Sequence, residues 1–296
     1  MTGQGKAGND VDKKPGDLSD ISETLLVTLY CRAVESETRD PIIVDRKACE
    51  IARKLDERLA ASPIRMHRML ANRALPRYLP ANMSLRARDF DRYVQEFLSK
   101  APDGAIVNMG CGLDSRCFRV DNGQALWFNL DLPEVIEFRR QFLEETDRYR
   151  SISSSVLDFS WMDGVKAAGR RDHMFMAEGL LMYFHEDQVK ALVLELLRRF
   201  PGSELVAEVT SSWIVRMLHG PFGRGSMQRK IGFARGVTFS FGVDSGDHFE
   251  RWDPRIEFLD ERFYCNETER KLGWLRHMVR FRKFKYAQWI VHYRLG

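Results

Sequence analysis

The sequence predicts an α/β protein with a mostly parallel sheet and helices on both of its faces. Two observations lead to this prediction. From Ala105 onward, short apolar runs of strand length alternate with longer segments of helical periodicity. The first of these runs ends in a glycine-containing turn, within AIVNMGCGLDSRCFRV, and α/β nucleotide sites commonly begin with such a strand and turn.

The chain begins with residues that are not expected to fold. Residues 1–20 are rich in Gly, Lys and Asp, which predicts a disordered tail. Helical periodicity begins at Ile21 in ISETLLVTLYCRAVE, where Ser19 or Asp20 can cap the helix. Because this helix is apolar on one face and follows a tail, we expect it to act as a lid over a cofactor.

Two further helices are expected before the first strand. They cover about 45–59 and 84–100, and the second ends before the Pro and Gly of APDG. Residues 21–100 are therefore expected to form a helical cap or lid, and residues 101–296 the core.

Strands and helices alternate through this core. The expected strands are 105–109, 125–131, 151–158, 173–179, 203–210 and a final one within 285–296. The expected helices between them are 133–146, with Pro133 in its first turn, and 185–200. Residues 211–265 are less regular and rich in aromatic side chains. We interpret them as an insertion near the carboxyl edge of the sheet that shapes a substrate pocket.

Composition excludes several classes of protein. The formal net charge of the 296 residues is +4, which is too small for a nucleic-acid groove but slightly favours an anionic small-molecule substrate. Five cysteines without a C-x-x-C pair predict neither a disulfide framework nor a zinc site, so no metal is expected and a reducing cytoplasm is favoured. No apolar run approaches the roughly 20 residues of a membrane span, and the N-terminus does not resemble a signal peptide.

The glycine turn points to a nucleotide cofactor. A dinucleotide fingerprint has three glycines, but here Ser115 follows Gly110 and Gly112 in the third place. Asp131 lies 19 positions after Gly112, where a carboxylate can accept hydrogen bonds from ribose hydroxyls. S-adenosylmethionine has no pyrophosphate and needs no phosphate-binding helix end, so the missing glycine favours it over NAD. An NAD-dependent oxidoreductase and a cofactor-binding scaffold without catalysis remain as alternatives.

Four motifs carry a resemblance to a known family. VNMGCGLDSRCFRV, NLDLPEVIEFRR, SSSVLDFSW and MAEGLLMYFHEDQVKALV occur in this order. Over roughly residues 20–296 the chain resembles the leucine carboxyl methyltransferase family, in particular its bacterial branch of polyketide (tetracenomycin-type) carboxyl O-methyltransferases. The resemblance implies a class I methyltransferase fold, with a seven-stranded sheet, and S-adenosyl-L-methionine as the methyl donor.

The resemblance also implies a set of cofactor-binding residues. Gly110 and Gly112 would form the close-approach turn and Asp131 would bind the ribose. Asp158 and Phe159 would contact the adenine.

The methionine part of the cofactor would meet two further residues. Arg86 matches the arginine that holds the methionine carboxylate, with Arg88 as a nearby alternative. Glu178 matches the acidic residue beside the methionine portion.

No catalytic side chain is expected, because methyl transfer to an ionised acceptor requires mainly alignment and desolvation. A carboxylate acceptor is already ionised at pH 7, whereas a phenol with a pKa of about 10 would need a general base. We therefore expect a methyl ester on a small organic acid, with a phenol or hydroxyl acceptor as the alternative. Cys111 lies between two glycines, where a small thiol indicates packing rather than a nucleophile. The run FRKFKY is basic and aromatic but leads into a strand, which indicates a solvated strand edge rather than an RNA contact.

Overall fold

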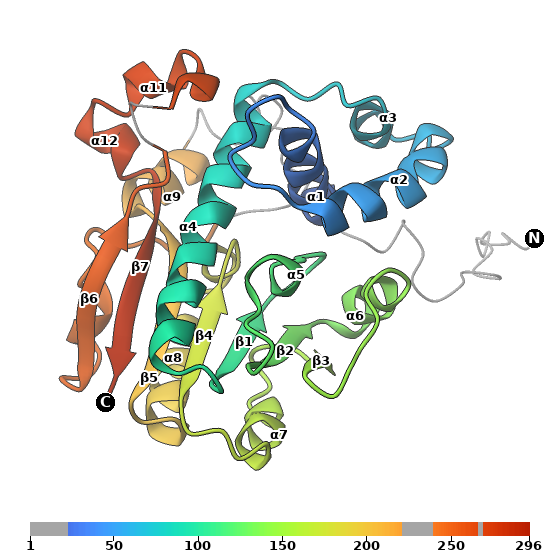
Figure 1. Cartoon of the computed structure of the whole chain (residues 1–296). Helices are drawn as coiled ribbons and strands as arrows, with labels where there is room; N and C mark the ends of the chain where they lie inside the picture. Colours follow the sequence, from blue (N-terminus) through green and yellow to red (C-terminus); the bar gives the residue numbers. More distant parts are fainter. Residues whose placement is uncertain (1–22, 221–238, 266–268) are drawn as a thin grey trace, which may run out of the picture.

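The structure is a computed structural model that describes residues 23–220, 239–265 and 269–296 (Figure 1). Residues 1–20, for which the sequence predicts a disordered tail, lie outside the described part. In that part of the chain, one seven-stranded sheet forms the centre of the molecule, with the order β3-β2-β1-β4-β5-β7-β6. The strands are β1 Ala105–Met109, β2 Leu126–Asp131, β3 Tyr149–Ser153, β4 His173–Ala177, β5 Ser203–Thr210, β6 Ile256–Arg262 and β7 Gln288–Leu295.

All the ladders are parallel except the two made by β7, which runs antiparallel to both β5 and β6. The prediction of a mostly parallel seven-stranded sheet is confirmed. Ala105 at the start of β1 pairs with Leu126 of β2 on one side and His173 of β4 on the other. The chain leaves β1 in one direction and returns to β4 in the other, so the carboxyl ends of β1 and β4 flank the topological switch point, where α/β proteins bind their ligands.

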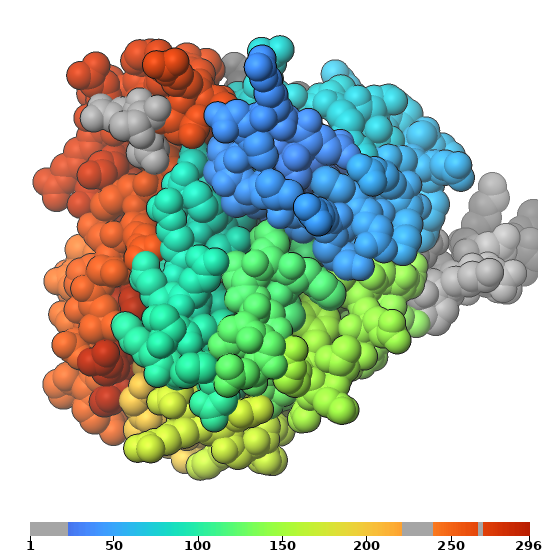
Figure 2. Space-filling view, viewed as in Figure 1, coloured from blue at the N-terminus to red at the C-terminus, as the bar shows by residue number. Residues whose placement is uncertain are grey.

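Helices cover both faces of the sheet. The longer helices are α1 Glu23–Ser36, α2 Arg46–Ala60, α3 Arg65–Ala71, α4 Tyr78–Lys100, α6 Pro133–Arg140, α7 Trp161–Ala167, α8 Glu186–Arg199 and α9 Ser212–His219. The short ones are α5 Cys117–Val120, α11 Leu275–Met278 and α12 Arg282–Lys285, with 3₁₀ turns η2 Leu181–Tyr183, η3 His248–Arg251 and η4 Arg270–Leu272. Figure 1 shows α1, α2 and α3 grouped at the end of the molecule where the carboxyl ends of the parallel strands lie, and in Figure 2 their residues, in shades of blue, form one continuous surface there.

The core consists of two layers separated by the sheet. Successive residues of a strand point to opposite faces. In β1, Ile106 therefore packs with Phe90 of α4 in one cluster, while Val107 packs with Leu192 of α8 in the other. Burial on both faces explains why the central strands are continuous apolar runs rather than alternating ones.

Several predicted helix and strand bounds differ from the structure. Helix α4 begins at Tyr78 rather than at 84, because Pro80 lies in its first turn, where a missing N–H costs no hydrogen bond. Helix α6 ends at Arg140 rather than at 146, and β3 covers Tyr149–Ser153 rather than 151–158. The short helix α3 was not expected from the sequence.

Of the predicted insertion 211–265, residues 221–238 lie outside the described residues, and the interpretation is wrong at Ile256–Arg262. The segment contains β6, which is the edge strand of the central sheet. Its register on β7 shifts between Phe258 and Asp260, so the two-residue alternation that identifies a strand is interrupted. The same segment begins with Ser211, whose hydroxyl caps α9 by accepting from the N–H of Ile214.

Candidate cofactor site

The glycine turn after β1 excludes side chains. Gly110 has a φ of 67°, and a Cβ on it would lie 2.8 Å from Cδ1 of Leu180. Gly112 has a φ of 45°, and a Cβ there would lie 3.3 Å from Cδ1 of Leu25 on α1. Both glycines hold a backbone conformation that L side chains rarely adopt. The turn therefore presents bare backbone at the carboxyl end of β1, between α1 and the segment after β4.

Asp131 at the end of β2 is fixed to this turn. One carboxylate oxygen accepts from the N–H of Gly112 at 2.7 Å, and the other accepts from the N–H of Leu132 at 2.8 Å. Burial raises the pKa of Asp131, although these two N–H groups act in the opposite direction. A carboxylate has about four acceptor positions, so Asp131 retains acceptor capacity for two ligand hydroxyls. Gly112 and Asp131 thus come together as the resemblance implies, and this geometry fits a ribose.

Arg86 on α4 lies between two carboxylates. Its Nε donates to Glu178 at 2.8 Å, and its Nη1 donates to Glu208 of β5 at 3.0 Å. The second oxygen of Glu208, which is fully buried, accepts from the hydroxyl of Tyr264 at 2.8 Å. Although burial opposes ionisation, the charges of Glu208 and Glu178 raise the pKa of Arg86, so it stays protonated.

Glu178, directly after β4, is held by a second arginine. Arg116 donates to Glu178 at 2.6 Å, and it also forms ion pairs with Asp91 and Asp114, both at 2.7 Å. Its side chain is 1% exposed. Burial favours a neutral Glu178, but Arg86 and Arg116 outweigh it and lower the pKa of this carboxyl. Glu178 is therefore an ionised group in a fixed position at the switch point.

The ion pairs continue into the helical cap. Arg119 bridges Asp91 to Asp45, and Asp45 also pairs with Arg32 of α1. Asp45 caps α2 by accepting from the N–H of Ala48. The whole chain of contacts, which we name the carboxylate–arginine network, consists of Arg32, Asp45, Arg86, Asp91, Asp114, Arg116, Arg119, Glu178 and Glu208.

The balance of charge in this network is negative. Four arginines face five carboxylates, so the named members carry a formal charge of −1, although each carboxylate has an arginine partner and the buried Arg139 also acts on Asp114. A cation placed beside Glu178 would compensate it. The sulfonium and the α-ammonium groups of S-adenosylmethionine are such cations, so the donor set fits this cofactor.

The two candidate arginines of α4 differ in position. Arg88 pairs with Asp89 at 3.1 Å and does not join the network, whereas Arg86 is part of it. Because Arg86 already contacts Glu178 and Glu208, a methionine carboxylate would be the third negative group around one guanidinium. The ligand's own ammonium group would offset that charge. Binding of the carboxylate by Arg86 stays a prediction.

The residues expected at the adenine are in a much more open place. Asp158 is exposed and accepts from the N–H of Ser160 at 3.1 Å. Phe159 is half-buried and packs against the core cluster on the α8 face. The N–H of Ser154 donates to the carbonyl of Asp131 at 3.0 Å, which brings the end of β3 beside the proposed ribose position. A hollow of about 460 Å³ lined in part by Ser154 and Asp158 opens here.

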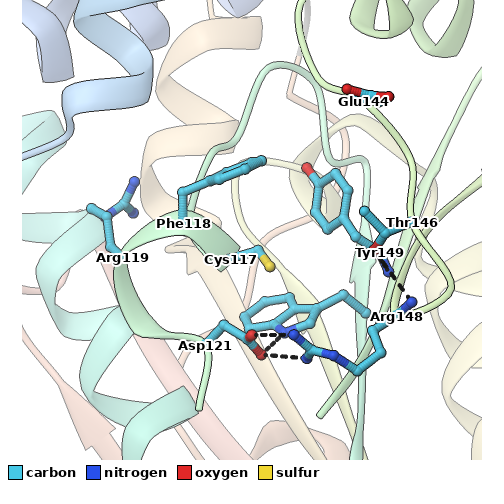
Figure 3. Close-up of a pocket in the computed structure, with 9 residues that line it drawn as sticks. Cys117, Phe118, Arg119, Asp121, Glu144, Thr146, Arg148 and Tyr149 are labelled. Atoms are coloured by element: carbon cyan, nitrogen blue, oxygen red, sulfur yellow. Dashed lines mark hydrogen bonds and ion pairs between the residues drawn. The ribbon is translucent and has the colours of Figure 1, made fainter. Parts of the chain in front are cut away.

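Another hollow, of about 350 Å³, lies at the opposite end of the strands (Figure 3). Phe118 and Tyr149 stand on its upper side in that view, and the ion pair between Asp121 and Arg148 on its lower side. Because Tyr149 and Trp127 come from the amino ends of β3 and β2, this hollow is separate from the switch point. We assign it no part in cofactor binding.

Aromatic side chains gather beside η2, the 3₁₀ turn that follows β4. Tyr183 of η2 contacts Phe239 with ring centroids 5.5 Å apart. His219 at the end of α9 hydrogen-bonds through Nε2 to the carbonyl of Phe239 at 2.8 Å, so that nitrogen carries the proton.

Burial raises the pKa of the Cys111 thiol to about 12, which keeps it protonated and unreactive at neutral pH.

Arg116, Glu208 and Tyr264 are among the members of this site that sequence reasoning missed. Glu208 offers a signal, because a carboxylate inside the apolar strand SELVAEVT is rarely buried without a partner. Arg116 and Tyr264 offer none, since charged and phenolic residues are common in turns. Ser115 also has a role that the sequence did not reveal. Its buried hydroxyl donates to the carboxylate of Asp45, where a third glycine could not.

The sheet order and the glycine–aspartate pair at its switch point define a class of protein, namely an α/β protein that binds an adenosine-containing cofactor at the carboxyl ends of its strands. Comparison with known families makes the assignment specific. Residues 25–196 match the leucine carboxyl methyltransferase family, and the chain belongs to it. It is an S-adenosylmethionine-dependent methyltransferase, which decides against NAD and against a scaffold without catalysis.

Two relatives are similar over most of their length. The tetracenomycin polyketide synthesis O-methyltransferase of Streptomyces glaucescens is 29% identical over 82% of this chain and 83% of that protein. An S-adenosyl-L-methionine-dependent methyltransferase of Gibberella zeae is 25% identical over 91% of each. Among solved structures, the magnesium protoporphyrin IX methyltransferase of Synechocystis with bound S-adenosylhomocysteine is similar at a TM-score of 0.46, with 9% identity over 84% of this chain and 99% of that one. In the described ranges, the chain has no helix that could cross a bilayer.

Proposed function

We propose that this enzyme transfers a methyl group to the carboxylate of a small organic acid and forms a methyl ester. The family name supports a carboxyl acceptor, and the similarity to a polyketide O-methyltransferase supports a small, secondary-metabolite acid. When bound, S-adenosylmethionine supplies an electrophilic methyl group on its sulfonium. The seven cofactor-binding residues named from the sequence are part of this proposal.

The observation that carries the proposal is the state of the acids at the switch point. Glu178 and Asp114 are each held by arginines, which lower the pKa of both carboxyls below the usual range. Neither group can act as a base near pH 7. Burial raises the pKa of the Tyr183 phenol, which keeps it protonated. An acceptor that arrives already ionised needs no proton transfer and suits such a site.

In this proposal the protein positions the reactants and excludes water. Helix α1 contacts the glycine turn through Leu25, and Arg32 donates to the carbonyl of Leu113 at 2.9 Å. The helical cap therefore covers the cofactor side of the site. Tyr183 and Phe239 provide an apolar wall on the acceptor side. Closure of this kind supplies the alignment and desolvation that an in-line displacement requires.

A phenol or hydroxyl acceptor is the second candidate, and His219 is the observation that favours it. Its Nε2 donates to the carbonyl of Phe239, so the imidazole lies beside the aromatic wall. A neutral imidazole is the commonest general base in enzymes. This candidate predicts that His219→Ala lowers kcat by about a hundredfold or more, whereas a carboxylate acceptor predicts little change in kcat.

The product and the pH profile separate the two candidates. With a carboxylate acceptor, mild alkali releases methanol from the product, and kcat is flat from about pH 6 to 8 because the acceptor is ionised throughout. An alkali-stable product, together with a rate that rises about tenfold per pH unit in that range, would assign the activity to a phenol.

A further inference from the structure

We propose that the segment Arg270–Tyr286 is an interfacial site that binds the surface of an anionic membrane. This inference goes beyond the proposed function and does not depend on the acceptor. The segment contains seven Lys or Arg residues and no Asp or Glu. Because the formal net charge of the whole chain is only +4, the other residues together carry a small negative charge, and the basic excess is local.

Three exposed basic side chains of this segment support the proposal: Arg282, Lys283 and Lys285. Residues 280–285 are exposed without interruption. Within the described part of the chain, Arg282, Lys283 and Lys285 form no ion pair with a carboxylate. Arg282 lies over the ring of Tyr286 and Lys285 over the ring of Phe263. These cations are therefore available to an anionic surface, which attracts each basic residue near it.

Large aromatic side chains project from the same segment. Trp274 is 63% exposed and Phe281 is 65% exposed, and Phe284 is 40% exposed. Tryptophan and phenylalanine favour the boundary between lipid headgroups and acyl chains, where basic residues remain at the phosphates. The alternation of exposed rings and cations along 280–285 is the pattern expected for that boundary.

The exposure of these rings does not result from loose attachment. Leu272 is fully buried in the core cluster and Val279 is nearly so. Lys271 pairs with Glu35 of α1 and ties the start of the segment to the helical cap. Hydrogen bonds within the short helices, such as that from the N–H of Lys285 to the carbonyl of Phe281 at 3.1 Å, hold the backbone. The segment is thus anchored on one side and directs its rings away from the core.

The location links this surface to the acceptor side of the site. Figure 1 shows α11 and α12 together at the end of the molecule that also carries α1 and α4's first turns. Phe284 of α12 contacts Trp213 of α9, with ring centroids 6.1 Å apart. Helix α9 itself starts at the carboxyl end of β5. A protein seated on a bilayer through this segment would place its acceptor side near the lipid, where apolar acids partition.

Vesicle co-sedimentation tests the proposal with the full-length protein. The vesicles contain either phosphatidylcholine alone or phosphatidylcholine with 40% phosphatidylglycerol, at about 0.1 M salt, where the Debye length is about 10 Å. We expect binding to the anionic vesicles only. Each of the double variants W274A/F281A and R282E/K283E should lower the partition coefficient by about tenfold or more.

The matched control reverses two exposed lysines elsewhere, K166E/K190E, and should bind within about twofold of the wild type, because charges farther than a Debye length from the lipid are screened. Circular dichroism melts establish that each variant is folded. The proposal is overturned if the wild type ignores anionic vesicles even at low salt, or if the control loses as much binding as R282E/K283E. It is also overturned if W274A/F281A binds as well as the wild type, since that result indicates a general polyanion site, as for an acidic protein.

Discussion

The two ends of the proposed cofactor site are built in different ways. At the proposed methionine end, Arg86 and Arg116 are buried, Glu178 is half-buried, and each has at least two charged partners. At the adenine end, Asp158 is exposed and its recorded contact is local, to the N–H of Ser160. The first end is preorganised by the fold itself, whereas the second is a surface loop. A substitution at the methionine end should therefore change both stability and cofactor binding. A substitution at the adenine end should change cofactor binding alone.

Removal of Arg116 should give the largest effect. Arg116→Met leaves Asp91, Asp114 and Glu178 each short of one partner, and breaking an ion pair of such a buried arginine costs about 3–5 kcal/mol of unfolding free energy. Urea unfolding measures the loss. Arg150→Met, which removes an exposed arginine on β3, should change the unfolding free energy by less than about 0.5 kcal/mol. Equal losses in the two variants would mean that the network does not stabilise the fold.

Low pH should have the second-largest effect on stability, again through the methionine end. Arginines lower the pKa values of Asp45, Asp114 and Glu178 in the folded protein. Their stabilising contribution is therefore complete above the unfolded values near pH 4 and is lost as pH falls through the lower folded values. The unfolding free energy should decline steeply from about pH 5 to 3. In Glu178→Gln, the slope over this range should be shallower, and an identical slope would exclude Glu178 from the effect.

Asp131 stands between the two ends, and its loss should affect binding more than stability. Asp131→Ala removes a charged acceptor of the proposed ribose hydroxyls, worth about 1.5–3 kcal/mol. Calorimetry should show S-adenosylhomocysteine binding at least about tenfold more weakly, with the fold retained. Because burial raises the pKa of Asp131, wild-type affinity should also fall as pH is lowered toward that range, and in Asp131→Ala this dependence should disappear. Unchanged affinity in the folded variant would reduce Asp131 to a support of the glycine turn.

The smallest effects are expected at the adenine end. Asp158→Ala removes one exposed hydrogen-bonding group, so cofactor affinity should fall by about two- to tenfold and the melting temperature of the free protein should not change. Differential scanning fluorimetry with and without S-adenosylhomocysteine measures both. A variant that loses stability without ligand would contradict the contrast between the two ends.

Much of the fold could be predicted from local patterns. The run SELVAEVT has strand length and strand composition, and β5 covers the same eight residues. The glycine turn and Asp131 could be paired because parallel neighbouring strands end at the same edge. In contrast, β6 was not predicted, because its bulge interrupts the alternation of side chains. The predicted start of α4 at 84 is too late, because a proline such as Pro80 usually marks a helix boundary but here lies in the first turn.

The sequence by itself determined the class of sheet and the position of the glycine turn and of Asp131 at its carboxyl edge, because strand length, apolar runs and glycine turns are properties of neighbouring residues. Only the tertiary structure decided the partners of Arg86. Glu178 and Glu208 lie 92 and 122 positions away from it along the chain, and Arg116 reaches Glu178 across 62 positions. Such pairs depend on which strands become neighbours and on how far burial strengthens their attraction, and neither is written in any short stretch of sequence.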